Sequence, residues 1–212
     1  TFGVSAMCTE LYPEVIAQIV KSGHDIAGHG FWQDKLLPDM TVEEQHSMIR
    51  RCQEMLEKAT GRRPNGWMTP SLAWTPETVE FLAQEGIDWY GDARDFDLPR
   101  RVVTKHGSLI AVPLSEFTDN RVLRSSPRDF HEVYKDTFDY LYKHEPISLL
   151  HMVLHCHWGG RPLMVAMVYQ LVEYFSQFSD VWFTTQGELA DWFRNQNIDQ
   201  LTYAHRYSSS PS

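Results

Sequence analysis

The sequence predicts an α/β fold built on a largely parallel sheet, and three observations lead to this class. Short apolar segments of strand length alternate with segments whose apolar residues recur at helical spacing. Capping residues and glycines mark where several of those helices begin and end. Polar residues follow the apolar segments, as expected when strand ends deliver side chains to one edge of a sheet. This alternation requires right-handed crossovers, in a sheet that is either doubly wound or closed into a barrel.

The first half of the chain alternates predicted strands with predicted helices. The strands are expected at residues 1–6, 24–28, 65–69 and 87–92. Start and stop signals for helices lie between them: Pro13 and Gly23 around residues 12–22, a capping box of Thr41 and Glu44 with a stop at Gly61, and Thr75–Pro76 with a stop at Gly86.

The second half continues the pattern. Its predicted strands and helices are short strands at residues 102–104 and 109–112, a helix opened by Ser126–Pro127, a helix over residues 162–178, a strand at 181–184 and a helix over 188–194. The continuous apolar run of residues 147–155 is typical of a strand buried on both faces. We therefore expect one domain over residues 1–195, followed by a polar tail over residues 196–212.

Charge and composition exclude several classes of partner. The formal net charge of −9 argues against nucleic acid, because phosphate binding needs clustered Lys and Arg. No Rossmann fingerprint or Walker loop occurs, which argues against nucleotide binding. No apolar run has the length of a membrane span and no signal segment opens the chain, so no membrane partner is expected. The three cysteines are an odd number without CxxC spacing, which argues against disulfides and structural zinc and favours a cytoplasmic location.

Two predicted strands end in residues that could carry chemistry. His29 follows strand 24–28, and a ligand four residues later could share one metal ion with it, but that position is Gln33, whose neutral amide is a poor zinc ligand. A histidine at a strand end can also be a hydrogen-bonded structural residue. Asp92 closes strand 87–92 and could bind a metal or orient a histidine, whereas the acidic residues around it are typical of solvated turns.

Residues 154–163, LHCHWGGRPL, are the most informative stretch. His155 and His157 lie two apart at the end of a predicted strand and would point the same way, so one could act as a general acid. The alternative is a packed strand end whose imidazoles bond to backbone carbonyls. Two glycines before Arg161 favour a loop that lets the guanidinium reach a carboxylate. Cys156, between the histidines, leaves a thiol nucleophile as a further alternative.

Two tryptophans near the predicted strand ends are candidates for the walls of a ligand pocket. Trp67 and Trp158 could hold substrate there, including a sugar ring, because aromatic side chains offer flat apolar surfaces. The alternative is that they cover an edge of the core.

The chain resembles the polysaccharide deacetylase superfamily, also called carbohydrate esterase family four, in five segments that follow the family's order and spacing: GHDIAGHGFWQ, RRPNGWMTPSLAWTPET, YGDARDFDLP, LHCHWGGRP and VWFTTQGELADWF. It looks closest to the branch that contains metal-independent allantoinases, cyclic imide hydrolases and related peptidoglycan deacetylases. The resemblance covers nearly all of residues 1–194. It implies a distorted, incomplete (β/α) barrel, here apparently lacking the first strand.

The resemblance also implies roles for the residues that match the family's motifs. His155 matches the histidine that protonates the leaving group, Asp92 an acidic residue that helps to orient it, and Arg161 a substrate contact. His29 matches the first metal-ligand histidine, and Gln33 stands where the second is expected. The segment RPNGW, with its Trp67, matches the motif that shapes the groove.

Two departures from the family's pattern affect the expected chemistry. The acidic pair that supplies the catalytic base and one metal ligand would lie before Thr1. Gln33 weakens any zinc site and points to the metal-independent branch. We therefore expect no cofactor, with a divalent metal such as zinc at His29 as the alternative.

The predicted function is hydrolysis of carbon–nitrogen bonds other than peptide bonds, with a carboxylate activating water and His155 protonating the departing nitrogen. The substrate is a small molecule, either an N-acetyl sugar or a cyclic amide or imide such as allantoin. The alternative is an inactive or truncated relative that binds carbohydrate or another ligand without the acidic pair. A homo-oligomer is also expected. The apolar residues near Met164 and Val165 could serve an interface or, by the usual rule for apolar helix faces, the core.

Overall fold

The structure is a computed structural model, and it describes residues 1–115, 117–122 and 126–196. The chain forms two compact units. Unit 1 comprises residues 1–93 and 99–112 and the described residues from 184 onward, and unit 2 comprises residues 94–98 and 113–183. The predicted tail lies outside the described residues from position 197 onward.

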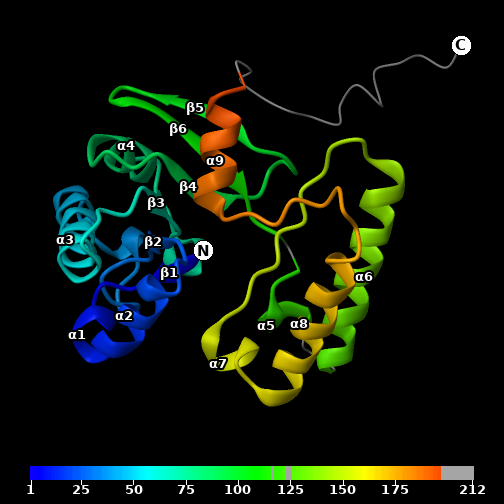
Figure 1. Cartoon of the computed structure of the whole chain (residues 1–212). Helices are drawn as coiled ribbons and strands as arrows, with labels where there is room; N and C mark the ends of the chain where they lie inside the picture. The colour runs from blue at the N-terminus through cyan, green and yellow to red at the C-terminus, as the bar shows by residue number, and fades with distance from the viewer. Residues whose placement is uncertain (116, 123–125, 197–212) are drawn as a thin grey trace, which may run out of the picture. The chain divides into compact units, whose positions relative to one another are not determined.

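Unit 1 is built on a six-stranded sheet in the order β1-β2-β3-β4-β6-β5 (Figure 1). Its strands are β1 (Phe2–Val4), β2 (Ile26–Gly28), β3 (Gly66–Trp67), β4 (Trp89–Ala93), β5 (Arg100–Thr104) and β6 (Gly107–Pro113). The first four are parallel neighbours, and β5 and β6 form an antiparallel hairpin. In the described part of the chain the sheet is open, with β1 and β5 at its edges. The parallel strands follow one another in chain order, which agrees with the predicted incomplete barrel and not with a doubly wound sheet.

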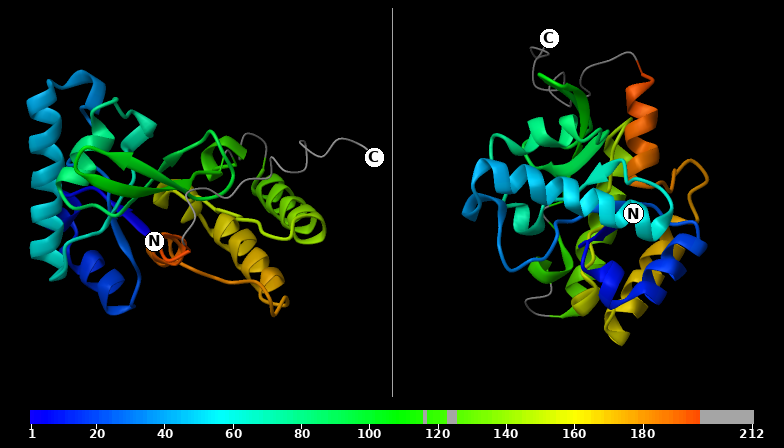
Figure 2. Two further views of the ribbon diagram at one scale, coloured as in Figure 1. Left: turned by 90° about the horizontal axis from the view of Figure 1, so that it is seen from above. Right: turned by 90° about the vertical axis from the view of Figure 1, so that its left-hand side faces the viewer.

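Helices and short 3₁₀ turns connect these strands: α1 (Cys8–Leu11), α2 (Pro13–Lys21), Leu37–Asp39, α3 (Val42–Thr60), Pro70–Leu72, α4 (Thr78–Gln84) and α9 (Gln186–Arg194). The capping box at the start of α3 is confirmed, because the Thr41 hydroxyl accepts from Glu44 N and the Glu44 carboxylate accepts from Thr41 N. Gly61 ends the helix at a φ of 74°, a conformation that glycine adopts without steric cost. Helix α3 packs against α2 and α4 and lies nearest the viewer in the right-hand view of Figure 2.

The predicted start of α4 is wrong by two residues, because the observed N-cap is Glu77 and not Thr75. Thr75 does not cap the helix, because its hydroxyl donates to Gln45 Oε1 at 2.7 Å, and its backbone N–H is taken by the Thr78 hydroxyl at 2.8 Å. The helix therefore begins at Thr78, without a side-chain cap. The tertiary contact with α3 outcompetes the local capping preference.

Two tryptophans pack the interior of the sheet against glycines on the neighbouring strand. A Cβ atom on Gly66 would lie 2.0 Å from the Trp89 ring, and one on Gly28 would lie 2.6 Å from the Trp67 ring. Both tryptophans are fully buried. Only glycine allows the rings to approach the backbone so closely, so these glycines are required by packing and not by a turn.

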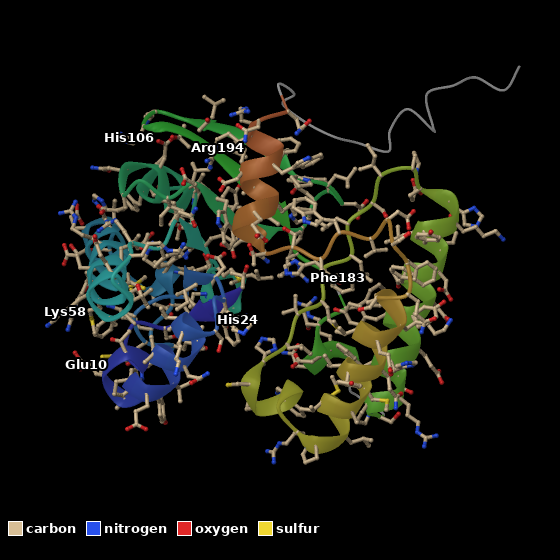
Figure 3. The ribbon with its side chains drawn as sticks, in the orientation of Figure 1. Glu10, His24, Lys58, His106, Phe183 and Arg194 are labelled. Atoms are coloured by element: carbon tan, nitrogen blue, oxygen red, sulfur yellow. The ribbon has the colours of Figure 1, made fainter. Side chains whose placement is uncertain are left out.

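Helix α9 closes unit 1 against β4. The Thr185 hydroxyl and the Glu188 carboxylate form its capping box, so the helix begins two residues before the predicted position. At its other end, Arg101 donates to the carbonyl of Arg194 at 3.3 Å. Figure 3 labels Arg194 there and His106 at the tip of the β5–β6 hairpin. No helix in the described ranges has both the length and the apolar character that crossing a membrane requires.

Unit 2 is helical. It contains α5 (Asp119–Val122), α6 (Pro127–His144), α7 (Cys156–Gly159) and α8 (Pro162–Phe175). Helix α6 has the predicted start, with a capping box formed by Ser126 and Asp129. The core lies between α6 and α8, which run side by side in Figure 1. It comprises Phe130, Tyr134, Phe138, Met164, Leu171 and Phe175. Met164 thus belongs to the core as expected, whereas Val165 is half exposed.

Two of the predicted strands, at residues 147–155 and 181–184, do not form, although the structure describes both segments. Residues 147–155 form only one bridge, between Val153 and Thr118, and Ile147 and Leu154 are exposed. A strand buried on both faces needs sheet neighbours on both sides, and here the apolar residues Leu150 and Met152 pack on the helical core instead. Residues 181–184 likewise form no strand, because Val181 also packs against that core.

Candidate active site

In unit 1, the candidate residues gather where the parallel strands end. His29 follows β2 directly, and its backbone N–H donates to Val4 O on β1 at 3.0 Å. Its ring Nδ1 is 2.7 Å from the carbonyl oxygen of Met68, the residue after β3. Because a carbonyl can only accept, Nδ1 carries the hydrogen and Nε2 is left as the nitrogen with a lone pair. The ring of His29 is therefore held in a defined orientation at the end of β2.

Asp92, on β4, is buried and receives two hydrogen bonds from one residue. Thr69 N donates to its Oδ1 at 2.8 Å and the Thr69 hydroxyl donates to its Oδ2 at 2.5 Å. Burial raises the pKa of the Asp92 carboxyl to about 6, against the lowering effect of the two hydrogen bonds from Thr69. The carboxyl thus fixes the turn after β3. These two contacts involve no histidine, and the predicted role of Asp92 in orienting the catalytic histidine stays a prediction.

Trp67 belongs to the core, and its predicted place in the wall of a substrate pocket is wrong. The side chain is fully buried, and its indole N–H donates to the Thr69 hydroxyl at 3.1 Å. Trp67, Thr69 and Asp92 therefore form one buried chain of hydrogen bonds. The position was misassigned because a tryptophan beside a strand end is also what a sheet needs to fill the space above a glycine of the next strand.

The residues around His29 do not by themselves make a metal site. Gln33 is exposed, and its amide donates to the Ser5 hydroxyl at 3.2 Å. Among the residues that the structure describes, no three His, Cys, Asp or Glu side chains come together in a group that could hold a metal ion. One imidazole and a neutral amide are a poor donor set for zinc, which prefers three or four nitrogen, sulfur or carboxylate ligands.

In unit 2, His155 is oriented by an aspartate that the sequence analysis did not identify. His155 Nδ1 lies 2.6 Å from Asp119 Oδ1, and His155 N donates to Asp119 Oδ2 at 2.6 Å. The Asp119 side chain is 0 % exposed and that of His155 is 41 % exposed. Because the carboxylate accepts at Nδ1, the exposed face of the ring presents Nε2. A buried anion behind an exposed imidazole is the arrangement that stabilises an imidazolium during proton transfer.

The surroundings of Asp119 keep this pair in place. Asp119 opens α5, and its backbone N–H donates to Val153 O at 3.2 Å beside the Thr118–Val153 bridge. Gly159, in α7, leaves room for the side chains of Leu154 and Asp119. A Cβ at this position would lie 3.0 Å from Leu154 and 3.4 Å from Asp119 Oδ2. The sequence analysis missed Asp119 because it lies in no apolar or strand-end pattern. The only local signal is an acidic residue at the start of a four-residue helix.

The other residues of segment 154–163 surround His155 on short helices and not on a strand. His155 is the residue before α7, and its ring centroid is 5.9 Å from that of His157. Trp158 and Arg161 are exposed. Arg161 Nε donates to His157 O at 3.1 Å. Their predicted substrate contacts remain predictions.

Tyr134 holds together the two segments that carry the pair. Its hydroxyl donates to Phe117 O, and Val153 N donates to the same hydroxyl at 3.4 Å. Burial raises the pKa of the Tyr134 phenol to about 12, so the hydroxyl stays protonated and continues to donate. The Tyr134 hydroxyl therefore connects the core of unit 2 to the segments just before Asp119 and His155.

The open parallel sheet and the exposed histidine backed by a buried aspartate define a class: an α/β protein with the acid–base machinery of a hydrolase. Comparison with known proteins indicates the family. Residues 1–90 match the family model described as polysaccharide deacetylase. The chain is 23 % identical over 227 residues to the peptidoglycan deacetylase of Helicobacter pylori, across 89 % of this chain and 76 % of that protein.

Two solved structures are similar as well. The crystal structure of Puue allantoinase has a TM-score of 0.82 and 28 % identity, over 92 % of this chain and 67 % of that one. The crystal structure of a probable polysaccharide deacetylase from Pseudomonas aeruginosa PAO1 has a TM-score of 0.81 and 27 % identity, over 91 % and 67 %. These findings confirm the resemblance to the polysaccharide deacetylase superfamily. They also confirm the predicted class, a hydrolase of carbon–nitrogen bonds other than peptide bonds.

Proposed function

We propose that His155 is the general acid in hydrolysis of an acyl–nitrogen bond, and that Asp119 is its positioning residue. The observation that carries this proposal is the imidazole whose Nδ1 lies on a buried carboxylate and whose opposite face is exposed. A histidine held in this way can deliver a proton from Nε2 without changing its orientation.

The reaction balances with two proton transfers. The oxygen of water attacks the carbonyl carbon, and the proton of the water goes to a carboxylate base. The carbon–nitrogen bond then breaks as His155 Nε2 gives its proton to the departing nitrogen. The resemblance assigns the base to a carboxylate of the family's acidic pair. An N-acetyl sugar gives acetic acid and a free amine, whereas a cyclic amide or imide gives one ring-opened molecule that carries a carboxylic acid and the released nitrogen.

The substrate belongs to one of two chemical classes, an N-acetyl sugar or a small cyclic amide or imide. The similar proteins include a peptidoglycan deacetylase and an allantoinase, which support one class each. Arg161 and Trp158 lie within six residues of His155 and are proposed to contact the substrate. His29 is proposed as the ligand for a divalent metal in unit 1, with Gln33 as a weak second donor.

The test is turnover of a substrate panel by the natural full-length polypeptide and its variants. The panel contains allantoin, succinimide and N-acetylglucosamine oligomers. His155→Gln is expected to lower kcat by a factor of about 10²–10⁴ and to change substrate affinity little, because protonation acts in the transition state. The matched control is His157→Gln, which removes a nearby imidazole that does not lie on Asp119.

Several outcomes would contradict the proposal. Unchanged kcat in His155→Gln would remove the general acid role, and an equal loss in His157→Gln would assign the effect to the segment as a whole. Substrate binding without turnover in the wild type would favour the non-catalytic alternative. Cys156→Ser is expected to keep its activity, and loss of turnover there would favour the thiol nucleophile instead. The cytoplasmic location and the homo-oligomer remain predictions.

A further inference from the structure

A hollow of about 280 Å³, here called the amino-end hollow, lies in unit 1 where the chain enters β2 and β3. Its walls come from the last turns of α2 and α3 and from the segments that lead from these helices into the two strands. They include Val20, His24, Ile26, Thr60, Arg62 and Pro64. Since β2 and β3 are parallel and His29 and Met68 follow them, the hollow lies at the opposite end of these strands from His29.

The backbone on both sides of the amino-end hollow is fixed by hydrogen bonds at the helix ends. After α2, His24 N donates to Ile19 O at 3.3 Å. At the end of α3, the Thr60 hydroxyl donates to Arg62 O at 2.7 Å and accepts from Arg62 N at 3.3 Å. Local structure therefore sets the positions from which the side chains of His24, labelled in Figure 3, and Arg62 project.

The lining of the amino-end hollow is basic on a chain that is acidic as a whole. Arg62 carries a permanent positive charge, and His24 contributes an imidazole that can donate a hydrogen bond. The described residues that line the hollow include no carboxylate, although the formal net charge of the chain is −9. This lining favours an anion over a cation.

The guanidinium of Arg62 has donors left for such an anion. Its Nη2 lies 3.5 Å from Asp25 Oδ1, which is longer than an ordinary N–H···O bond. A guanidinium carries five N–H donors, and the Arg62 side chain is 73 % exposed. The Asp25 carboxylate also accepts from the Thr1 hydroxyl at 3.2 Å. Arg62 can therefore turn two N–H groups toward a ligand while Asp25 keeps another partner.

The rest of the lining is apolar and selects among anions. Ile26 and Pro64 are buried, whereas Val20 is 39 % exposed. A ligand with a short hydrocarbon body would remove this apolar surface from water, and inorganic phosphate would not. A carboxylate also matches the planar fork of a guanidinium with two parallel hydrogen bonds. The volume is smaller than that of sites for drug-sized molecules, which restricts the ligand to a small one.

We propose that the amino-end hollow is a binding site for a small aliphatic carboxylate. Arg62 holds the carboxylate through two N–H groups, His24 donates to it from the side of α2, and the hydrocarbon body lies over Val20. The site uses none of the residues of the proposed reaction, so it does not depend on the proposed function.

The test is a titration of the full chain with butyrate, followed through the saturation-transfer NMR signal of the butyrate methyl group. Arg62→Gln is expected to raise the Kd of butyrate by about tenfold or more, because two charge-assisted hydrogen bonds are lost. Arg62→Lys keeps the charge without the fork and is expected to raise Kd by about threefold. His24→Gln is expected to raise it by about threefold as well, because one donor is exchanged for a neutral amide.

Two controls separate a built site from attraction to positive charge in general. Arg128→Gln removes an exposed guanidinium on α6 that does not line the hollow, and it should leave the Kd of butyrate unchanged. Butyramide has the same hydrocarbon body without the charge and should bind at least about tenfold more weakly than butyrate.

The remaining outcomes would overturn the proposal. These are the absence of saturable butyrate binding, an unchanged Kd in Arg62→Gln, an equal loss in Arg128→Gln, and butyramide binding as tight as that of butyrate. Inorganic phosphate that displaces butyrate at a lower concentration than butyrate itself requires would overturn the assignment to a carboxylate. Because Arg62 and His24 are exposed, their variants are expected to fold, and circular dichroism checks this.

Discussion

Two buried aspartates, Asp92 in unit 1 and Asp119 in unit 2, differ in what their carboxylates hold. Asp92 accepts from the backbone and the hydroxyl of Thr69. Asp119 accepts from the backbone and the ring of His155. Each carboxylate therefore bonds one residue through both of its oxygens, and Asp119 Oδ1 also accepts from Asn120 N at 2.7 Å. The partner of Asp92 is a buried hydroxyl, whereas the partner of Asp119 is an imidazole that reaches solvent.

The difference teaches that burial and hydrogen bonding do not identify a catalytic carboxylate. A threonine hydroxyl does not exchange a proton with substrate near neutral pH, so the two bonds from Thr69 to Asp92 serve the turn after β3. A histidine does exchange protons in that range, so Asp119 can influence the reaction through it. The pKa of Asp92, raised to about 6 by burial, would by itself have favoured the wrong residue.

The largest expected effect comes from exchanging the two carboxyls for amides. Asp119→Asn is expected to lower kcat by a factor of about 10²–10³ with little change in KM. Asp92→Asn is the matched control and should keep kcat within about fivefold. A larger loss of kcat in Asp92→Asn than in Asp119→Asn would reverse the comparison.

The next largest expected effect is on the free energy of unfolding, compared between a buried tryptophan of unit 1 and an exposed tryptophan of unit 2. Trp67→Ala is expected to lower the free energy of unfolding by about 3–5 kcal/mol, because it opens a cavity and removes a buried hydrogen bond. Trp158→Ala, at an exposed tryptophan, is expected to change it by about 0.5 kcal/mol or less. Urea denaturation measures both. A small loss of unfolding free energy in Trp67→Ala would contradict its place in the core and would again make Trp67 a candidate for a pocket wall.

The raised pKa of Asp92 predicts a pH effect on stability with a definite sign. Between about pH 4 and pH 6 the folded chain keeps a proton on Asp92 that the unfolded chain has released, so stability falls as pH rises through this window. Relative to Asp92→Asn, the wild type should lose on the order of 3 kcal/mol between pH 4 and pH 7. Urea denaturation at both pH values measures the difference. A gain with rising pH would contradict the burial of the carboxyl.

The smallest expected effect tests the support beneath the His155–Asp119 pair. Tyr134→Phe removes a hydroxyl that bonds Phe117 O and Val153 N, and should lower the free energy of unfolding by about 1–3 kcal/mol. Tyr142→Phe, at an exposed phenol that bonds Asp180, is the control and should cost about 0.5 kcal/mol or less. Thermal denaturation measures both variants. Equal losses would show that the Tyr134 hydroxyl does not support the pair.

Prediction from the sequence worked where the signal is local. The helix from Val42 to Thr60 was recognised because a capping box and a glycine stop act within a few residues of its ends. Prediction from the sequence failed where the structure of a segment depends on the segments that pack against it. The apolar run 147–155 has the composition of a buried strand, and whether such a run pairs with strands or packs on helices depends on neighbours that are distant in sequence.

The sequence by itself determined the α/β class and most helix boundaries, because capping and periodicity act locally. Only the tertiary structure decided that Asp119 lies behind His155 while Asp92 bonds Thr69, and that Trp67 belongs to the core while Trp158 is exposed. These assignments depend on distances between segments that lie tens of residues apart. Side-chain type alone carries no information about which of two aspartates or two tryptophans folds into which place.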